Sequence, residues 1–260
     1  MFRSHSAIAV QLRVLFALVM REMATRYGKS AGGYVWAILE PLIWIALFSA
    51  IFGYIARNPP IGEHFPLFYA TGYLPFHLYM EVSNTVGMSV QVNKNLMSFP
   101  RITLIDAVLS RFILQIITNI VVSFVILSFM LRIFDDQTRI DLGPLFTGFG
   151  LAALFGLGVG AFNCVLFAYS PTWQRIFGIV NRPMFLISGV FFTYESLPRE
   201  ARDILWWNPL IHAVGLAREA FYPIYEAGYA SVGYAVGIAL LLIMLGILLL
   251  RALRAEILDG

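Results

Sequence analysis

Charged residues are scarce in this sequence. Asp, Glu, Lys and Arg make up 13% of its 260 residues, whereas hydrophobic residues make up 59%. Soluble domains carry about 25% charged residues. The deficit excludes a soluble body of this size and indicates a polytopic, all-α membrane protein. The formal net charge is only +3 and the basic residues form no single tract, which argues against nucleic-acid binding.

Residues that commonly carry chemistry are also missing. The single cysteine, Cys164, cannot form an intrachain disulfide. The four histidines show no metal-ligand spacing. We therefore expect no catalytic residue and no metal site.

A phosphate-binding loop is absent as well. Gly28-Lys29-Ser30 is similar to the end of such a loop, but the motif needs a glycine where Met23 stands. The segment before it follows a helical rather than a strand pattern. We expect this chain to bind no cofactor and to hydrolyse no ATP by itself.

The first 32 residues are not typical of a cleaved signal peptide, because Gln11 and Arg13 interrupt the apolar run and no small-residue cleavage site follows. Apolar residues recur there at helical spacing. This pattern predicts an amphipathic helix lying flat at the cytoplasmic interface, with Arg13 and Arg21 reaching lipid headgroups.

Apolar stretches of about 20 residues, the length that crosses a bilayer, follow this helix. Residue patterning predicts six spans, over residues 34–56, 65–90, 105–131, 145–169, 176–194 and 231–250. The second contains Gly72, Pro75, His77 and Glu81, so we expect it to be bent or broken. The fourth is rich in glycine, which lets helices approach closely. Ser170–Arg175 is expected to be a turn.

Residues 195–225 are only intermittently apolar. Asn208-Pro209 divides them into two short helices, neither long enough to span. Two such helices suit a re-entrant hairpin at the outer membrane face, and a loop lying on that surface is the alternative.

The distribution of Lys and Arg predicts the orientation of the chain in the membrane. With six spans, 12 of the 18 basic residues fall on the side of the two termini. The other six are Arg57, Arg132, Arg139, Arg199, Arg202 and Arg218. The excess predicts that both termini are cytoplasmic.

A carboxylate near the start of a span is costly, and Glu40 is such a residue. It could pair with Arg26, Lys29 or Arg111, or it could be hydrated at headgroup depth, and Glu81 has the same ambiguity. Aromatic residues near one membrane face suit an interface belt or packing, and some could line a path for sugars.

Three stretches together resemble the permease subunit of ABC-2 exporters of bacterial polysaccharides, in particular capsular polysaccharide. The first runs from Arg21-Glu22 through Gly33-Tyr34 and Trp36 to Glu40-Pro41. The second runs from Phe65-Pro66 through Pro75-Phe76 to Asn93, Asn95 and Pro100. The third runs from Leu197-Pro198 through Asn208-Pro209-Leu210 to His212.

The resemblance implies that residues 1–260 form one ABC-2 transmembrane domain, with residues 1–32 as the cytoplasmic helix and 195–225 as periplasmic gate helices. It implies a homodimer in the bacterial inner membrane, bound to two copies of a separate ATPase that carries ATP and Mg. The substrate would be a lipid-linked polysaccharide, and a periplasmic co-polymerase or export protein would be a further partner. Residues implied in ATPase coupling are Arg21, Arg26, Asn95, Leu96, Phe99 and Arg101. Those implied in the conduit or gate are Glu40, Tyr69, Phe191, Tyr194, Trp206, Trp207, Asn208 and His212.

Other functions stay open at this point. An ABC-2 permease could instead export an O-antigen or teichoic-type polymer, a drug or a glycolipid. A membrane enzyme acting on lipid-linked sugars would need a carboxylate or histidine constellation, which the sequence does not offer. A secondary transporter should show internal repeats, and none is found.

Overall fold

The structure, a computed structural model, describes residues 7–27, 32–55, 58–93, 103–134 and 139–253. All regular secondary structure in these ranges is helical, which confirms the all-α prediction. The helices are α1 (Ala7–Tyr27), α2 (Gly33–Ile55), α3 (Phe65–Gly87), α4 (Ser89–Asn93), α5 (Leu104–Ile133), α6 (Leu142–Tyr169), α7 (Pro171–Ile187), η2 (Tyr194–Ser196), α8 (Arg199–Leu205), α9 (Pro209–Glu219) and α10 (Val232–Ala252).

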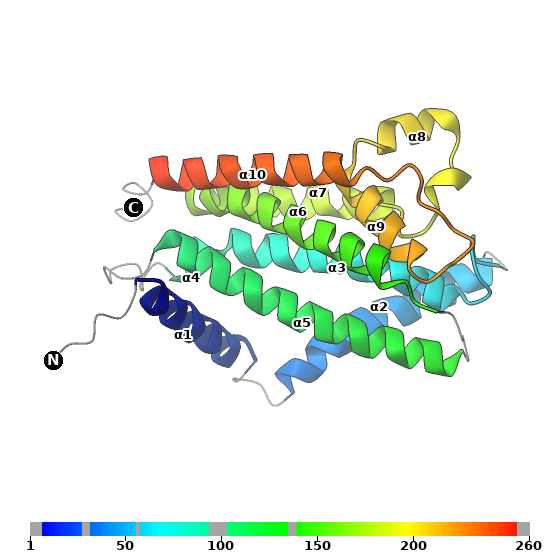
Figure 1. Ribbon diagram of the computed structural model, residues 1–260, viewed down its shortest axis with the longest axis horizontal. Helices are drawn as coiled ribbons and strands as arrows, with labels where there is room; N and C mark the ends of the chain where they lie inside the picture. Colours follow the sequence, from blue (N-terminus) through cyan, green and yellow to red (C-terminus); the bar gives the residue numbers. More distant parts are fainter. Residues whose placement is uncertain (1–6, 28–31, 56–57, 94–102, 135–138, 254–260) are drawn as a thin grey trace.

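The bundle is built around α3 and α6, which pack along each other, with α5 against α3 and α10 against α6 (Figure 1). Helix α1 lies against the first half of α5, and α9 lies against α6. Helix α1 and the last turns of α10 are at one end of the bundle, while α8 and α9 are at the other (Figure 1). We call these the α1 end and the α9 end.

Helix α3 forms the core of the bundle. It is one continuous helix through Gly72 and Pro75, so no break occurs at those residues, but the predicted span 65–90 is divided at Met88, between α3 and α4. Most of its residues are buried, among them polar ones such as Ser83 and His77. Some of these polar side chains bond to α3 itself, as Ser83 does to the Met80 carbonyl, and others bond to neighbouring helices, as His77 does to Asn119.

Glycines on α6 bring the helices close together, as the sequence predicted. A Cβ on Gly156 would lie 3.0 Å from the Tyr79 carbonyl of α3, and one on Gly148 would lie 2.6 Å from the Ala213 carbonyl of α9. Gly158 faces α10 in the same way. By contrast, a Cβ on Gly150 would meet nothing within 4 Å. Only some of these glycines are therefore needed for packing.

The turn predicted at Ser170–Arg175 is wrong, because α7 begins there. The Ser170 hydroxyl accepts a hydrogen bond from the Trp173 amide at 3.4 Å, and Pro171 occupies the first helical position. Serine followed by proline is a helix-start signal, which the turn interpretation overlooked. Helix α7 ends at Ile187, so the backbone up to η2 is not helical.

Within the described ranges, four helices are long and apolar enough to cross a membrane: α2, α5, α6 and α10. Only 17% of the apolar window in α2, and the same share in α10, is buried inside the chain. The remaining apolar surface would be costly in water and is suited to lipid or to another membrane subunit. The structure therefore indicates a multi-pass membrane protein.

Candidate functional site

A buried charge pair joins α1 to α5. Glu22, which is 5% exposed, accepts a hydrogen bond from Arg111 Nη2 at 3.1 Å and another from Arg21 Nη2 at 3.0 Å. Arg111 Nη1 donates to the Thr85 carbonyl of α3 at 3.0 Å. A carboxylate buried this deeply is tolerated when it is paired and hydrogen-bonded. The pair fixes α1 against the core of the bundle.

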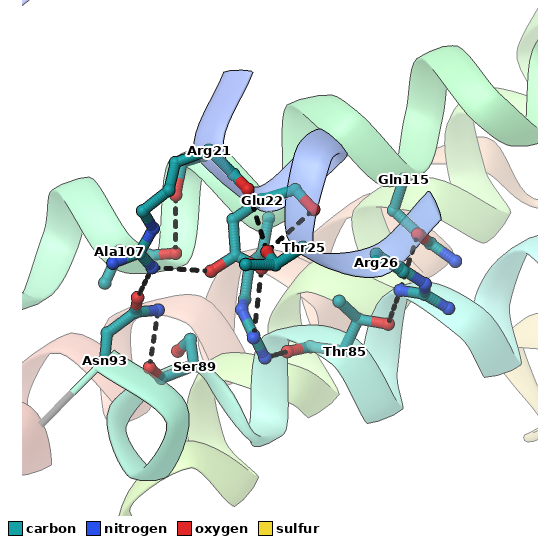
Figure 2. A network of polar contacts seen from close by, with 11 residues as sticks. Arg21, Glu22, Thr25, Arg26, Thr85, Ser89, Asn93, Ala107 and Gln115 are labelled. Carbon is teal, nitrogen blue, oxygen red and sulfur yellow. Dashed lines mark hydrogen bonds and ion pairs between the residues drawn. The ribbon is translucent and has the colours of Figure 1, made fainter. Parts of the chain in front are cut away.

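A second contact joins α1 to α4. Arg21 Nη2 also donates to Asn93 Oδ1, and Asn93 Nδ2 donates to the Ser89 carbonyl at 3.0 Å (Figure 2). Asn93 is the last residue of α4. Arg21 therefore connects α1 to the helix that leads into residues 94–102.

Arg26, one turn further along α1, reaches into the bundle (Figure 2). Its guanidinium donates to Glu81 Oε2 at 2.7 Å, to Thr85 Oγ1 at 2.9 Å and to Gln115 Oε1 at 3.1 Å. Gln115 Nε2 donates to the same Glu81 oxygen at 2.5 Å. Helices α1, α3 and α5 thus meet at one carboxylate.

The start of α5 is held by α1 as well. Asp106 and Thr103 form a capping box, in which each side chain accepts a hydrogen bond from the other's amide. Gln11 Nε2 of α1 donates to the second oxygen of Asp106 at 2.6 Å. Because α1 is bonded to α3, α4 and α5, a displacement of α1 would act on all three helices.

The structure gives partners to the cations considered above. Arg21, expected to reach lipid headgroups, has its guanidinium bonded to Glu22 and Asn93. Of the partners considered for Glu40, Arg26 pairs with Glu81 and Arg111 pairs with Glu22, while Lys29 lies outside the described residues. Such choices depend on how helices pack, which the charge pattern alone does not specify. Hydration of Glu40 at headgroup depth stays a prediction.

Most of the residues predicted to contact an ATPase belong to residues 94–102. Asn95, Leu96, Phe99 and Arg101 lie outside the described residues, as does Lys29. Of the predicted coupling set, Arg21 and Arg26 are described, and both belong to the network at the α1 end.

A pocket of about 260 Å³ opens beside this network, between α1, α2, α3 and α5. It brings together charged, amide and aromatic side chains from all four helices. Its lining residues are Arg26, Gly33, Trp36, Ala37, Glu40, His77, Glu81, Gln115, Thr118, Asn119 and Val122.

Two predicted conduit residues, Tyr69 and Phe191, belong to an aromatic cluster between α2, α3 and α7. Their ring centroids are 5.3 Å apart, and Phe48 of α2 stacks on Tyr69 at 5.6 Å. Phe185 lies 5.0 Å from Phe191. Tyr69 has no solvent-exposed surface in the isolated chain. The cluster therefore packs helices together, whatever further role its rings have.

At the α9 end, His212 is bonded on both ring nitrogens. Nε2 lies 2.8 Å from the Trp206 carbonyl and donates to it, while Nδ1 accepts from the Ser231 amide at 3.3 Å. One donor and one acceptor require a neutral imidazole. Burial lowers the pKa of His212, in agreement with this geometry.

The remaining predicted gate residues surround this histidine. The Trp206 ring stacks on Tyr234 at 4.9 Å, and Trp207 is 66% exposed. Tyr194 stacks on Tyr229 at 4.0 Å. Asn208 caps α9, because its side chain accepts from the Leu210 amide at 3.0 Å. The two short helices predicted around Asn208-Pro209 are confirmed as α8 and α9.

Sequence reasoning missed Arg218, which is 1% exposed. Its guanidinium donates to the carbonyls of Gly189 at 2.9 Å, Val190 at 3.1 Å and Phe192 at 3.0 Å, and lies 4.1 Å from the Phe68 ring centroid. We call this arrangement the Arg218 clasp. Its signal was an arginine near the end of a mostly apolar helix, which the topology count had used only as a charge on the outer side.

Within the ranges that the structure describes, no three His, Cys, Asp or Glu side chains gather closely enough to hold a metal ion. Cys164 is buried and its sulfur lies 3.1 Å from Ser89 Oγ, so it belongs to the packing of α4 against α6.

Comparison with known proteins agrees with this architecture. Residues 13–222 match the family described as ABC-2 type transporter. The polysialic acid transport protein KpsM of Escherichia coli is 30% identical over 95% of this chain and 96% of its own length. The capsule polysaccharide export inner-membrane protein BexB of Haemophilus influenzae is 26% identical, over 94% of this chain and 92% of its own. CtrC of Neisseria meningitidis serogroup B, which bears the same description, is 26% identical over 93% and 91%. The matched family covers most of the chain, and we conclude that this protein belongs to the ABC-2 type transporter membrane family.

Proposed function

We propose that this chain is the membrane subunit of an ATP-driven exporter that moves lipid-linked capsular polysaccharide across the bacterial inner membrane. The observation that carries the proposal is end-to-end similarity to proteins named for polysialic acid transport and capsule polysaccharide export. Similarity over more than nine-tenths of both chains favours a shared substrate class over a shared fold alone.

In the proposed arrangement, α3 and α7 cross the membrane together with the four apolar helices. Six spans place both termini in the cytoplasm and α8 and α9 on the periplasmic side. The excess of Lys and Arg on the side of the termini supports this orientation. So does the position of α1 and the last turns of α10 at one end of the bundle (Figure 1).

The chain acts as a homodimer with two copies of a separate ATPase, which binds ATP and Mg. Helix α1 and the segment with Asn95, Leu96, Phe99 and Arg101 form the contact with that ATPase. The bonds from α1 to α3, α4 and α5 support this role, because a push on α1 would reach the helices that line the pocket. The gate lies at α8 and α9, and a periplasmic export protein receives the polymer there.

The test is deletion of the gene in its own host, followed by complementation. We expect capsule to disappear from the cell surface and polymer to accumulate inside the cell, and the intact gene to restore both. Normal surface capsule in the deletion strain would reject the proposal. O-antigen lost while capsule persists would assign the chain to the alternative polymer.

A further inference from the structure

The pocket between α1, α2, α3 and α5 has one wall that is already organised. His77 Nδ1 lies 3.1 Å from Asn119 Oδ1, and Asn119 Nδ2 donates to the Gln115 carbonyl at 2.9 Å. Gln115 in turn donates to Glu81, which also receives Arg26. His77, Asn119 and Gln115 are buried, so this relay fixes their orientation before any ligand arrives.

The opposite wall, from α2, is open. Glu40 is exposed and makes no hydrogen bond or ion pair with any residue that the structure describes. Trp36, one helical turn earlier, is 60% exposed and lines the same pocket. A carboxylate and an indole ring are thus presented together, four residues apart on one helix face.

The charge of the pocket restricts its ligand. The described lining residues include one cation, Arg26, and two carboxylates, Glu40 and Glu81, which together carry a formal charge of −1. The cation is already paired with Glu81 at 2.7 Å. A phosphate or carboxylate ligand would face the Glu40 carboxylate, and close like charges repel. The pocket is therefore suited to a neutral or positively charged ligand.

Hydroxyl groups fit the side chains best. A carboxylate accepts hydrogen bonds from hydroxyls, and such charge-assisted bonds are about twice as strong as neutral ones. Amides such as Asn119 both donate and accept. An exposed indole supplies a flat apolar surface for the C–H face of a sugar ring. A purely cationic ligand would make no use of the amide-rich wall.

We propose that this pocket binds a neutral, hydroxyl-rich sugar unit, with Glu40 accepting its hydroxyls and Trp36 stacking on its ring. The inference rests on the proposed function and deepens it, because it assigns a saccharide contact at the α1 end, beside the network that would receive the push from the ATPase. A sugar seated there would contact α2 and the Arg26–Glu81 pair together.

The test uses the full chain with its ATPase in lipid nanodiscs. The probes are octyl glucoside and octyl phosphate below their micelle concentrations, which share an alkyl chain and differ in the head group. Binding is measured by saturation-transfer NMR on the head-group protons or the phosphorus-adjacent methylene. We expect the glucoside to bind more tightly than the phosphate. Trp36→Ala should weaken the glucoside at least tenfold and Glu40→Gln at least threefold.

Trp44→Ala is the matched control, since Trp44 lies on α2 and is also exposed but does not line the pocket. It should leave glucoside binding within twofold of the wild-type value. Glu40→Gln should also strengthen octyl phosphate binding, because it removes a negative charge.

Two results would overturn the inference: tighter binding of the phosphate in a manner that depends on Arg26, or glucoside binding that is equal in all variants. The first would assign the pocket to an anionic lipid headgroup. Surface capsule is measured in the same variants, so that a failure of the pocket assignment can be distinguished from a failure of the proposed function. Capsule export by a chain whose pocket binds no glucoside would reject the pocket and leave the proposed function intact.

Discussion

At the α1 end of the bundle, the buried cation Arg111 is neutralised by the carboxylate of Glu22, whereas at the α9 end Arg218 is held by three backbone carbonyls and a phenylalanine ring. The first arrangement joins side chains of different helices, so a movement of α1 changes it directly. The second holds the backbone between α7 and η2. Because Arg218 bonds to carbonyls there, this contact does not depend on the side chains of that segment. Under the proposed function, the first contact would pass a movement of α1 on to α5, and the second would keep the segment between α7 and η2 in place.

The largest effect is expected at the α1 end. Glu22→Ala leaves Arg111 buried without its carboxylate, which should lower the free energy of unfolding by about 3–5 kcal/mol. Thermal unfolding of the purified protein in detergent measures it. Glu63→Gln, at an exposed position, is the control and should change little.

The pair itself is not expected to add much stability over an apolar replacement. Glu22→Met combined with Arg111→Met should recover most of the stability lost by Glu22→Ala, because no unpaired charge remains. The coupling of ATP hydrolysis to polymer export should not recover, because α1 has lost its charged connection to α5. Full recovery of capsule export in the double variant would contradict a transmitting role for the pair.

A smaller loss is expected at the clasp. Arg218→Met removes three charge-assisted hydrogen bonds but also a buried cation, so the net cost should be about 2–3 kcal/mol. Arg218→Lys should be intermediate, because an ammonium lacks the planar fork that reaches several carbonyls. Equal stability of all three proteins would mean that the clasp does not hold the segment between α7 and η2.

Substitution of Gly72 tests how tightly α3 packs against the Arg218 clasp. A Cβ there would lie 2.5 Å from Arg218 Nη2 and 3.1 Å from the Val190 backbone, so Gly72→Ala should cost about 1–3 kcal/mol. Gly150→Ala is the matched control, because its Cβ meets open space. Alanine is the better helix former by about 1 kcal/mol, so that control should be neutral or stabilising. The same effect at both glycines would show that Gly72 is not tightly packed in solution.

The sequence predicted features that depend on local signals. Asn208-Pro209 was interpreted as a break followed by a helix, and it is one, because the asparagine caps and the proline occupies the first turn. Ser170-Pro171 carries the same signal and was taken for a turn. The glycines of α6 were recognised because small residues have few other roles at that density.

The charge network could not be predicted, for a physical reason. Glu22 and Arg111 are 89 positions apart in the sequence. For Glu40, the sequence offered several cations as equally suitable partners. The packing of α1 and α2 against α5 determines which carboxylate pairs with which cation. That packing depends on the contacts of many side chains at once. The sequence singled out Glu40 and Glu81 as costly carboxylates, but it missed the buried Glu22 and did not specify the partners of these residues.

The smallest effect is a pH dependence at the α9 end. Because burial lowers the pKa of His212, the unfolded chain binds a proton more readily than the folded one just below the ordinary value of 6.5. Stability that is present above pH 6.5 should therefore fall as the pH is lowered, by at most about 1.4 kcal/mol per pH unit. Melting temperatures of the wild-type protein and His212→Gln at pH 7.5 and 5.5 measure it. An equal decline in both would exclude His212 as the cause.

Transport by purified components tests the central claim most directly. Proteoliposomes would contain this chain, its ATPase or both, with lipid-linked capsular polysaccharide supplied on the side of the ATPase. We expect polymer to cross only when both proteins and hydrolysable ATP are present, and Glu22→Ala to reduce transport more than it reduces ATP hydrolysis. Transport by the chain without the ATPase, or none by an intact complex that hydrolyses ATP, would contradict the account.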